Sequence, residues 1–114
     1  MSFSEQTEKL TQDLIQAEYL NACEQFGDKY HSLHEGYAVL KEEVEEVEDC
    51  IKRLKNEIDY IWTCIKKNKT KIIKYSVDDC FNMFTNNAMK ELAQVGAVLQ
   101  KIKNTLEGKK DDVL

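Results

Sequence analysis

The chain has 114 residues, of which 42% are hydrophobic and 32% are charged, and it contains no proline. This length suits a single domain over residues 1–114, and the lack of proline favours an all-α fold built from long helices. The net charge of −5 argues against a nucleic-acid polymer as partner, because phosphate backbones attract basic surfaces.

The first predicted helix runs from Ser4 to about Gln25, with Ser4 as its N-cap. Its apolar residues form a ragged stripe at helical spacing. Gly27 follows this segment and is predicted to be its left-handed C-terminal cap.

The second predicted helix begins at Ser32, which has Glu35 three residues later as in a capping box, and continues to Lys66 or Lys67. Its apolar residues alternate steps of four and three, which is typical of a heptad seam. The seam consists of Leu33, Tyr37, Leu40, Val44, Val47, Ile51, Leu54, Ile58, Ile61 and Ile65. A charged helix of this length must bury its seam against another element.

A basic run then joins the second helix to the third, which is predicted over Val77–Leu106 with Ser76 as its N-cap. The run contains Lys66, Lys67, Lys69, Lys71 and Lys74. These lysines either complement the helix dipole in water or attract an anionic ligand. The apolar stripe of the third helix, which Glu91 interrupts, comprises Val77, Phe81, Phe84, Ala88, Val95, Val98 and Ile102. Residues 108–114 are polar and predicted to be disordered.

Three helices, two of them long, predict an antiparallel helical bundle. Such a bundle leaves apolar surface uncovered, so we expect completion by oligomerisation, as a homodimer or homotetramer. No segment reaches the ~20 apolar residues of a membrane span and no signal peptide is visible, so we expect a cytoplasmic protein without a membrane partner. The four widely spaced cysteines are expected to be reduced packing thiols.

Two glutamates stand out in the acidic segment of the second helix. With Val44 at heptad position a, Glu43 falls at g and Glu46 at c, on a flank that is half apolar. Four other acidic residues fall on the solvated side, namely Glu42, Glu45, Glu48 and Asp49. If the long helices pack antiparallel, Glu43 and Glu46 can meet Glu91 and Gln94 of the third helix.

Like charges on a partly buried flank are costly unless a cation neutralises them. Oxygen ligands of this kind suit Mg²⁺, with Mn²⁺ as a substitute. The alternative is that both glutamates are surface residues of a charged helix.

The stretch from His31 to Glu46 resembles the MazG-like branch of the all-α nucleoside triphosphate pyrophosphohydrolases. That family carries an E-x-x-E motif on one helix and an E-x-x-D motif on a later one. Glu43 and Glu46 match the first motif, preceded by Glu42 as in the family. The segment from Lys90 to Val98 resembles the second motif, but Gln94 stands where the family has Asp.

The resemblance implies an oligomeric helical bundle that cleaves a nucleoside triphosphate to monophosphate and pyrophosphate with Mg²⁺. Glu43 and Glu46 would be catalytic, and Glu91 would join them as a metal ligand. Gln94, Asn87 and Lys90 are the candidate substrate-binding residues. Gln94 offers a neutral oxygen in place of a charged one, so we expect weak or divergent activity. The alternative is an inactive MazG-like protein that binds a nucleotide or a protein partner.

Two other features have alternative interpretations. His31 and His34 lie one turn apart and could ligate a transition metal with Glu35, although Ser32 and Glu35 already explain this segment as a helix start. Trp62 could stack on a base, although burial at a subunit interface explains it equally well.

Overall fold

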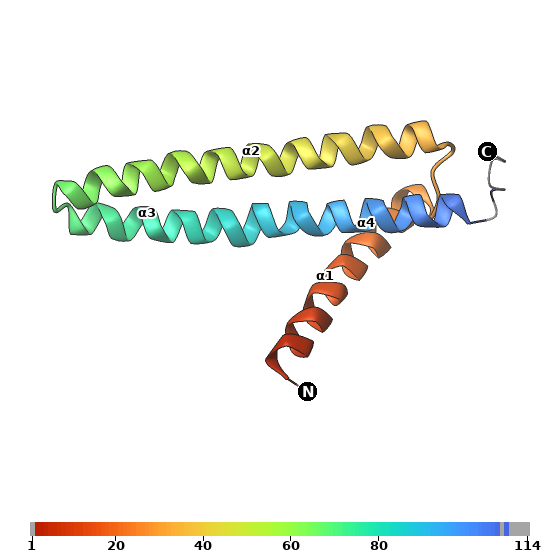
Figure 1. Ribbon diagram of the computed structural model, residues 1–114, viewed down its shortest axis with the longest axis horizontal. Coiled ribbons are helices and arrows are strands. Elements are labelled where there is room, and N and C mark those ends of the chain that lie inside the picture. Colours follow the sequence, from red (N-terminus) through yellow and green to blue (C-terminus); the bar gives the residue numbers. More distant parts are fainter. Residues whose placement is uncertain (1, 108, 110–114) are drawn as a thin grey trace, which may run out of the picture. The chain divides into compact units, whose positions relative to one another are not determined.

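The computed structural model describes residues 2–107 and 109, which are helical throughout apart from short connections and ends (Figure 1). The elements are α1 (Phe3–Phe26), α2 (Leu33–Lys66), α3 (Thr70–Met83), the π-helix η1 (Phe84–Ala88) and α4 (Met89–Leu106). The predicted all-α class with long helices is therefore confirmed. None of these helices is both long enough and apolar enough to cross a membrane. The disorder predicted for residues 108–114 lies, Lys109 excepted, outside the described residues.

The ends of α1 are set by Ser2 and Gly27. The Glu5 N–H donates to Ser2 Oγ at 3.1 Å, and the Ser2 N–H donates to the Glu5 carboxylate at 3.2 Å. This reciprocal capping box makes Ser2 the N-cap, so the prediction of Ser4 was wrong by two residues. Gly27 has φ 79° and ψ 177°, so its φ is positive as predicted but its conformation is not the left-handed helical one, and its N–H donates to the Cys23 carbonyl at 2.8 Å.

The two serines predicted to cap the long helices have different outcomes. Ser32 is confirmed, since its Oγ accepts the Glu35 N–H at 3.1 Å. Ser76 is not an N-cap, because α3 already begins at Thr70 and Ser76 lies inside that helix, only 5% exposed. A serine followed by acidic residues imitates a helix start, but the preceding isoleucines and lysines are themselves good enough helix formers to extend α3 backward.

The turn between α2 and α3 is closed by backbone hydrogen bonds. Asn68 has φ 55° and its N–H donates to the Ile65 carbonyl at 3.1 Å, while the Lys69 N–H donates to the Cys64 carbonyl at 3.0 Å. This pair of bonds is the Schellman arrangement, in which asparagine substitutes for glycine in the left-handed position. It allows two long helices to reverse direction within three residues, from Lys67 to Lys69.

The chain divides into two compact units. Unit 1 comprises the described residues of 1–43 and 93–114, and unit 2 comprises residues 44–92. The single domain expected over residues 1–114 stays a prediction.

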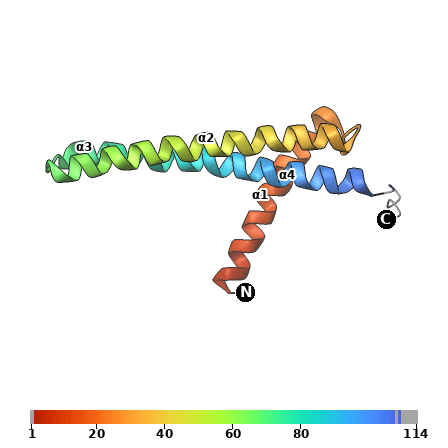
Figure 2. The ribbon, with the colours of Figure 1, turned by 45° about the horizontal axis from the view of Figure 1, so that its top comes forward.

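Unit 2 is a helical hairpin in which α2 runs antiparallel beside α3 (Figures 1 and 2). Its buried side chains are small, namely Cys50, Cys64, Ser76 and Ala88. The predicted seam of α2 is only half buried here. Val47, Leu54 and Ile61 are partly covered, whereas the alternate seam residues Val44, Ile51, Ile58 and Ile65 are 38%, 39%, 57% and 45% exposed. The intrachain contact is therefore rotated toward the flank of Cys50 and Cys64, away from the predicted centre of the seam.

A π-helix explains why the apolar stripe of the third helix was also misplaced. In α3 the covered positions are Ile72, Ile73, Ser76, Cys80 and Met83, and the next buried position is Ala88. The step from Met83 to Ala88 is five residues, which a π-turn supplies and a period of 3.6 does not. The predicted stripe residues Val77, Phe81 and Phe84 are consequently 50%, 66% and 43% exposed.

Unit 1 packs α1 across α4, and the start of α2 also lies against α4, where a Cβ placed on Gly36 would be 3.0 Å from Ile102. A Cβ placed on Gly96 would lie 2.9 Å from two carbons of Ile15, so α1 rests directly on the α4 backbone. Asn104 of α4 donates to the Tyr19 hydroxyl of α1 at 2.6 Å. The Tyr30 N–H donates to the Thr105 hydroxyl at 2.9 Å, which ties the α1–α2 connection to α4. All four cysteines of the chain are free thiols, as predicted.

Candidate functional site

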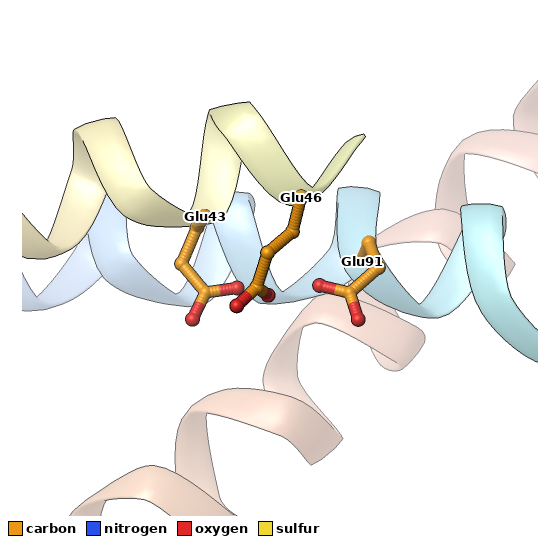
Figure 3. A group of neighbouring side chains, drawn as sticks. All are labelled: Glu43, Glu46 and Glu91. Carbon is orange, nitrogen blue, oxygen red and sulfur yellow. The ribbon is translucent and has the colours of Figure 1, made fainter. Parts of the chain in front are cut away.

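Three glutamates from two helices meet in one cluster (Figure 3). Glu43 and Glu46 project from α2 and Glu91 from α4, and each contributes one carboxylate oxygen to a group whose members lie within 4.8 Å of one another. Glu43 and Glu91 are half-buried and Glu46 is exposed. The antiparallel arrangement thus brings together the glutamates that the heptad register had selected.

The local helix geometry explains the cluster. Glu43 and Glu46 are three residues apart on α2 and so share one face of that helix. Glu91 lies three residues after the buried Ala88, so the two residues share one face of the helix. The π-turn η1 places that face on the covered side. The same register leaves Glu42, Glu45, Glu48 and Asp49 exposed, as predicted.

The cluster suits a hard divalent cation. Carboxylate oxygens are the preferred ligands of Mg²⁺ and Mn²⁺, and the repulsion between three converging carboxylates falls when a cation binds them. Within residues 2–107 and 109 this is the one group of three metal-ligating side chains that converge. His31, His34 and Glu35 accordingly do not form the transition-metal site that their spacing allowed.

Unit 1 contains a pocket of about 900 Å³, a volume that suits a small organic ligand. Its walls are one face of α1, the α1–α2 connection, the start of α2 and one face of α4. The polar lining residues include Glu43, Gln94, Lys101, Tyr30 and Lys29. Glu43 therefore belongs both to the carboxylate cluster and to the pocket.

A buried lysine is the most unusual group of this pocket. Lys101 is only 5% exposed, and its Nζ lies 4.4 Å from the centroid of the Tyr30 ring and 5.9 Å from that of Phe26. Both rings attract the ammonium through their negative faces. Burial raises the pKa of the Tyr30 hydroxyl, and the charges of Glu35 and Glu43 raise it further. Negative charge therefore reaches the aromatic side of the pocket.

The predicted substrate-binding residues separate into two groups. Gln94 lines the pocket together with Glu43. Asn87 of η1 and Lys90 of α4 are exposed and do not line it, so their contact with substrate stays a prediction. Trp62 is 57% exposed, with the Lys66 ammonium 5.6 Å from its ring centroid. The lysines of the basic run are all exposed, which both interpretations of this run allow.

Sequence reasoning missed Lys101, Tyr30 and Phe26 as pocket residues. The stripe of the third predicted helix was drawn through its branched apolar residues, whereas the buried face of α4 contains Ala93, Ala97, Val98, Lys101 and Thr105. The sequence did contain a signal for this face. Ala93 and Ala97 are four residues apart, and small residues at that spacing allow another helix to approach closely. Lysine is rarely buried, so its place on that face was not expected.

Comparisons with protein-family models, with curated proteins and with solved structures found no match to this chain.

Proposed function

We propose that this protein is a Mg²⁺-dependent nucleotide pyrophosphohydrolase of divergent, MazG-like type. The observation that carries the proposal is the convergence of Glu43, Glu46 and Glu91 from two helices, with ligand oxygens within 4.8 Å of one another. The pocket beside Glu43 supports it, because its volume of about 900 Å³ accommodates a nucleotide.

In this proposal the three glutamates hold Mg²⁺ or Mn²⁺, which when bound neutralises phosphate charge and polarises the attacked phosphorus. The exposed Glu46 is the group best placed to accept a proton from an attacking water, since solvent reaches it directly. Gln94 lines the pocket beside Glu43 and can donate its amide N–H to a phosphate oxygen.

Gln94 also limits the proposed activity. The family motif has a carboxylate at this position, and an amide contributes one neutral oxygen to a metal. Loss of one anionic ligand lowers affinity for a divalent cation, so turnover is expected to be slow or to require high metal concentration.

Metal binding is tested by thermal unfolding with Mg²⁺ and Mn²⁺. A metal at 100 times its dissociation constant stabilises the folded state by about 2.7 kcal/mol, so the melting temperature of the wild type should rise. The double variant Glu43→Gln/Glu46→Gln should lose this rise. The matched control Glu42→Gln/Glu45→Gln removes two neighbouring exposed carboxylates and should keep it. A wild type that neither metal stabilises contradicts the proposal.

Catalysis is tested by pyrophosphate release from a panel of nucleoside triphosphates, with monophosphate measured in the same reaction. We expect release that depends on Mg²⁺ or Mn²⁺ and that Glu46→Ala abolishes. Release of orthophosphate in place of pyrophosphate would assign a different reaction to the site.

A second candidate is an inactive helical protein that binds a nucleotide or a protein partner. The amide at Gln94 favours loss of catalysis, and the exposed apolar residues of unit 2 favour an association surface. Metal-dependent stabilisation without pyrophosphate release from any nucleotide would select this candidate.

We also propose that the chain associates with itself, as a homodimer or homotetramer. The support is the number of large apolar side chains that the hairpin of unit 2 leaves exposed. These are Val44, Ile51, Ile58, Tyr60, Trp62, Ile65, Tyr75, Val77, Phe81, Phe84, Met89 and Leu92, each 38–66% exposed. A second copy offers the same residues, and a symmetric pairing would cover both sets at once.

A further inference from the structure

We propose that Lys101 is a base-recognition residue: the unit 1 pocket holds the base of a nucleotide, and the Lys101 ammonium donates to a carbonyl oxygen of that base. The inference rests on the proposed function for the choice of a nucleotide as ligand. It adds a residue, a location and a preference among bases.

The ammonium of Lys101 is open to the pocket although the side chain as a whole is buried. Among the described residues, every fully buried side-chain nitrogen and oxygen has a hydrogen-bond partner. Lys101 forms contacts with the rings of Tyr30 and Phe26 and has neither a hydrogen bond nor an ion pair with another described side chain. Its Nζ therefore keeps access to the pocket, where it can donate to a ligand.

The pocket has two ends along α4. The four lining residues of α4 are separated by three, one and three positions, so they share one face of that helix. They are Gln94, Ala97, Val98 and Lys101. Gln94 and Lys101 are separated by about 10 Å along the axis at 1.5 Å per residue. Glu43 lines the same pocket as Gln94 and belongs to the carboxylate cluster, so a metal-bound phosphate belongs at that end. The ribose then directs the base along α4 toward Lys101.

The Lys101 end suits a neutral base better than a phosphate. Glu35 and Glu43 lie close enough to Tyr30 to raise the pKa of its hydroxyl, so their negative charge opposes the attraction that Lys29 and Lys101 would exert on a phosphate there. Small apolar side chains, Ala97 and Val98 on α4 and Ala22 on α1, offer a surface for a flat ring. Phe26 is 74% exposed and adds an aromatic face.

The chemistry of an ammonium sets the preference among bases. A lysine has three donors and no acceptor, so it bonds a ring carbonyl and offers nothing to an exocyclic amino group. Uracil, thymine, hypoxanthine and guanine present a carbonyl at the position where cytosine or adenine presents an amino group. Adenine has no carbonyl and is therefore the base that the pocket should accept least well.

The test measures binding of inosine monophosphate, uridine monophosphate and adenosine monophosphate by calorimetry with Mg²⁺ present, since monophosphates are products of the proposed reaction and are not cleaved further. Inosine and adenosine monophosphates differ at the position-6 carbonyl or amino group. We expect wild type to bind at least one carbonyl-bearing nucleotide about tenfold or more tighter than the adenine nucleotide, as for a hydrogen bond to a charged donor. Lys101→Met should reduce that affinity to the adenine level and leave adenine binding unchanged.

Matched variants keep the test interpretable. Lys101→Met preserves most of the buried aliphatic stem, and Lys103→Met changes an exposed lysine of α4 that does not line the pocket. If Lys101→Met does not fold, Ala22→Met places a larger side chain in the pocket from α1, with Ala17→Met on exposed α1 surface as its control. Ala22→Met should weaken binding about tenfold and Ala17→Met should not.

Three results would overturn the assignment. Equal affinity of wild type for carbonyl-bearing and adenine nucleotides would remove the preference. If Lys101→Met lowers the affinity for all three nucleotides equally, the ammonium contacts the phosphate and not the base. Lack of binding by every nucleotide in the set would remove the pocket as a base site. Glu46-dependent pyrophosphate release together with any of these three results would leave the proposed function standing while this inference fails. Lys101-dependent binding without any hydrolysis would do the reverse.

Discussion

The two units use helices for different purposes. Unit 1 joins three segments through side-chain hydrogen bonds that connect residues far apart in sequence, such as Asn104 with Tyr19 and Thr105 with Tyr30. It encloses a pocket and buries a charged lysine. Unit 2 is a hairpin of two long helices that buries small residues and exposes large apolar ones.

This difference indicates that unit 1 is suited to ligand binding and unit 2 to association with another copy. Polar connections that fix helix positions favour a preformed pocket, because a ligand then meets side chains already in place. Exposed apolar stripes on a two-helix unit favour association, because burial of these residues requires a partner surface. The predictions below change one unit at a time, so that each tests whether its effect stays within that unit.

The largest effect is expected from Ile58→Lys in unit 2. Ile58 is 57% exposed, and in a symmetric dimer each copy would lose about 1–1.5 kcal/mol of apolar burial, or roughly a hundredfold in association in total. Light scattering should therefore show a lower mass for Ile58→Lys than for wild type. Asn56→Lys adds the same charge on the opposite side of α2 and should leave the mass unchanged. A wild type that is monomeric at all concentrations contradicts the proposed oligomer.

A smaller effect is expected from Gly96→Ala in unit 1. The added Cβ would lie 2.9 Å from Ile15, whose β-branched side chain cannot easily rotate away. Overpacking of this kind costs typically 1–3 kcal/mol, against a gain of roughly 0.5–1 kcal/mol in helix propensity. Denaturant unfolding should show a net loss of stability.

In the Ile15→Ala background the clash is absent, so Gly96→Ala should there be neutral or stabilising. A double-mutant cycle measures this coupling. Equal effects of Gly96→Ala in both backgrounds would show that α1 does not rest on Gly96.

The smallest effect concerns the pH dependence of unit 1. Burial, then Glu35 and Glu43, raise the pKa of Tyr30 above its ordinary value of 10.0. Because the folded pKa is the higher one, this stability is fully present below about pH 10 and is lost as the pH rises through the folded pKa. In the wild type we therefore expect the unfolding midpoint to fall as the pH rises above 10. Tyr30→Phe should make this fall smaller. Tyr75→Phe, at an exposed position of unit 2, should leave the fall as it is in wild type.

The sequence predicted most of the helices and the carboxylate cluster for clear physical reasons. Helices without proline have few possible ends, and Gly27 and Ser32 marked two of them correctly. Glu43 and Glu46 were found because their heptad positions placed them beside the seam. Antiparallel packing then required a partner on the later helix, which Glu91 supplies.

The remaining features depend on interactions that local patterns do not carry. Ser76 has the residues of an N-cap but lies in a longer helix, where packing against α2 overrides the local signal. The π-turn at Phe84–Ala88 has no periodic signature, so every stripe position before it was assigned to the wrong side. The burial of Lys101 follows from two aromatic rings that arrive from a different part of the chain.

The π-turn also makes a change in length tolerable at this point of the chain. It accommodates one residue more than a regular α-helix needs between the covered positions on either side of it. Deletion of Asn86 would reduce the step from Met83 to Ala88 to four residues, which an α-helix spans in about one turn. Ser76, Cys80 and Ala88 would then stay on the covered side of an uninterrupted α-helix, so loss of this one codon should leave the hairpin intact.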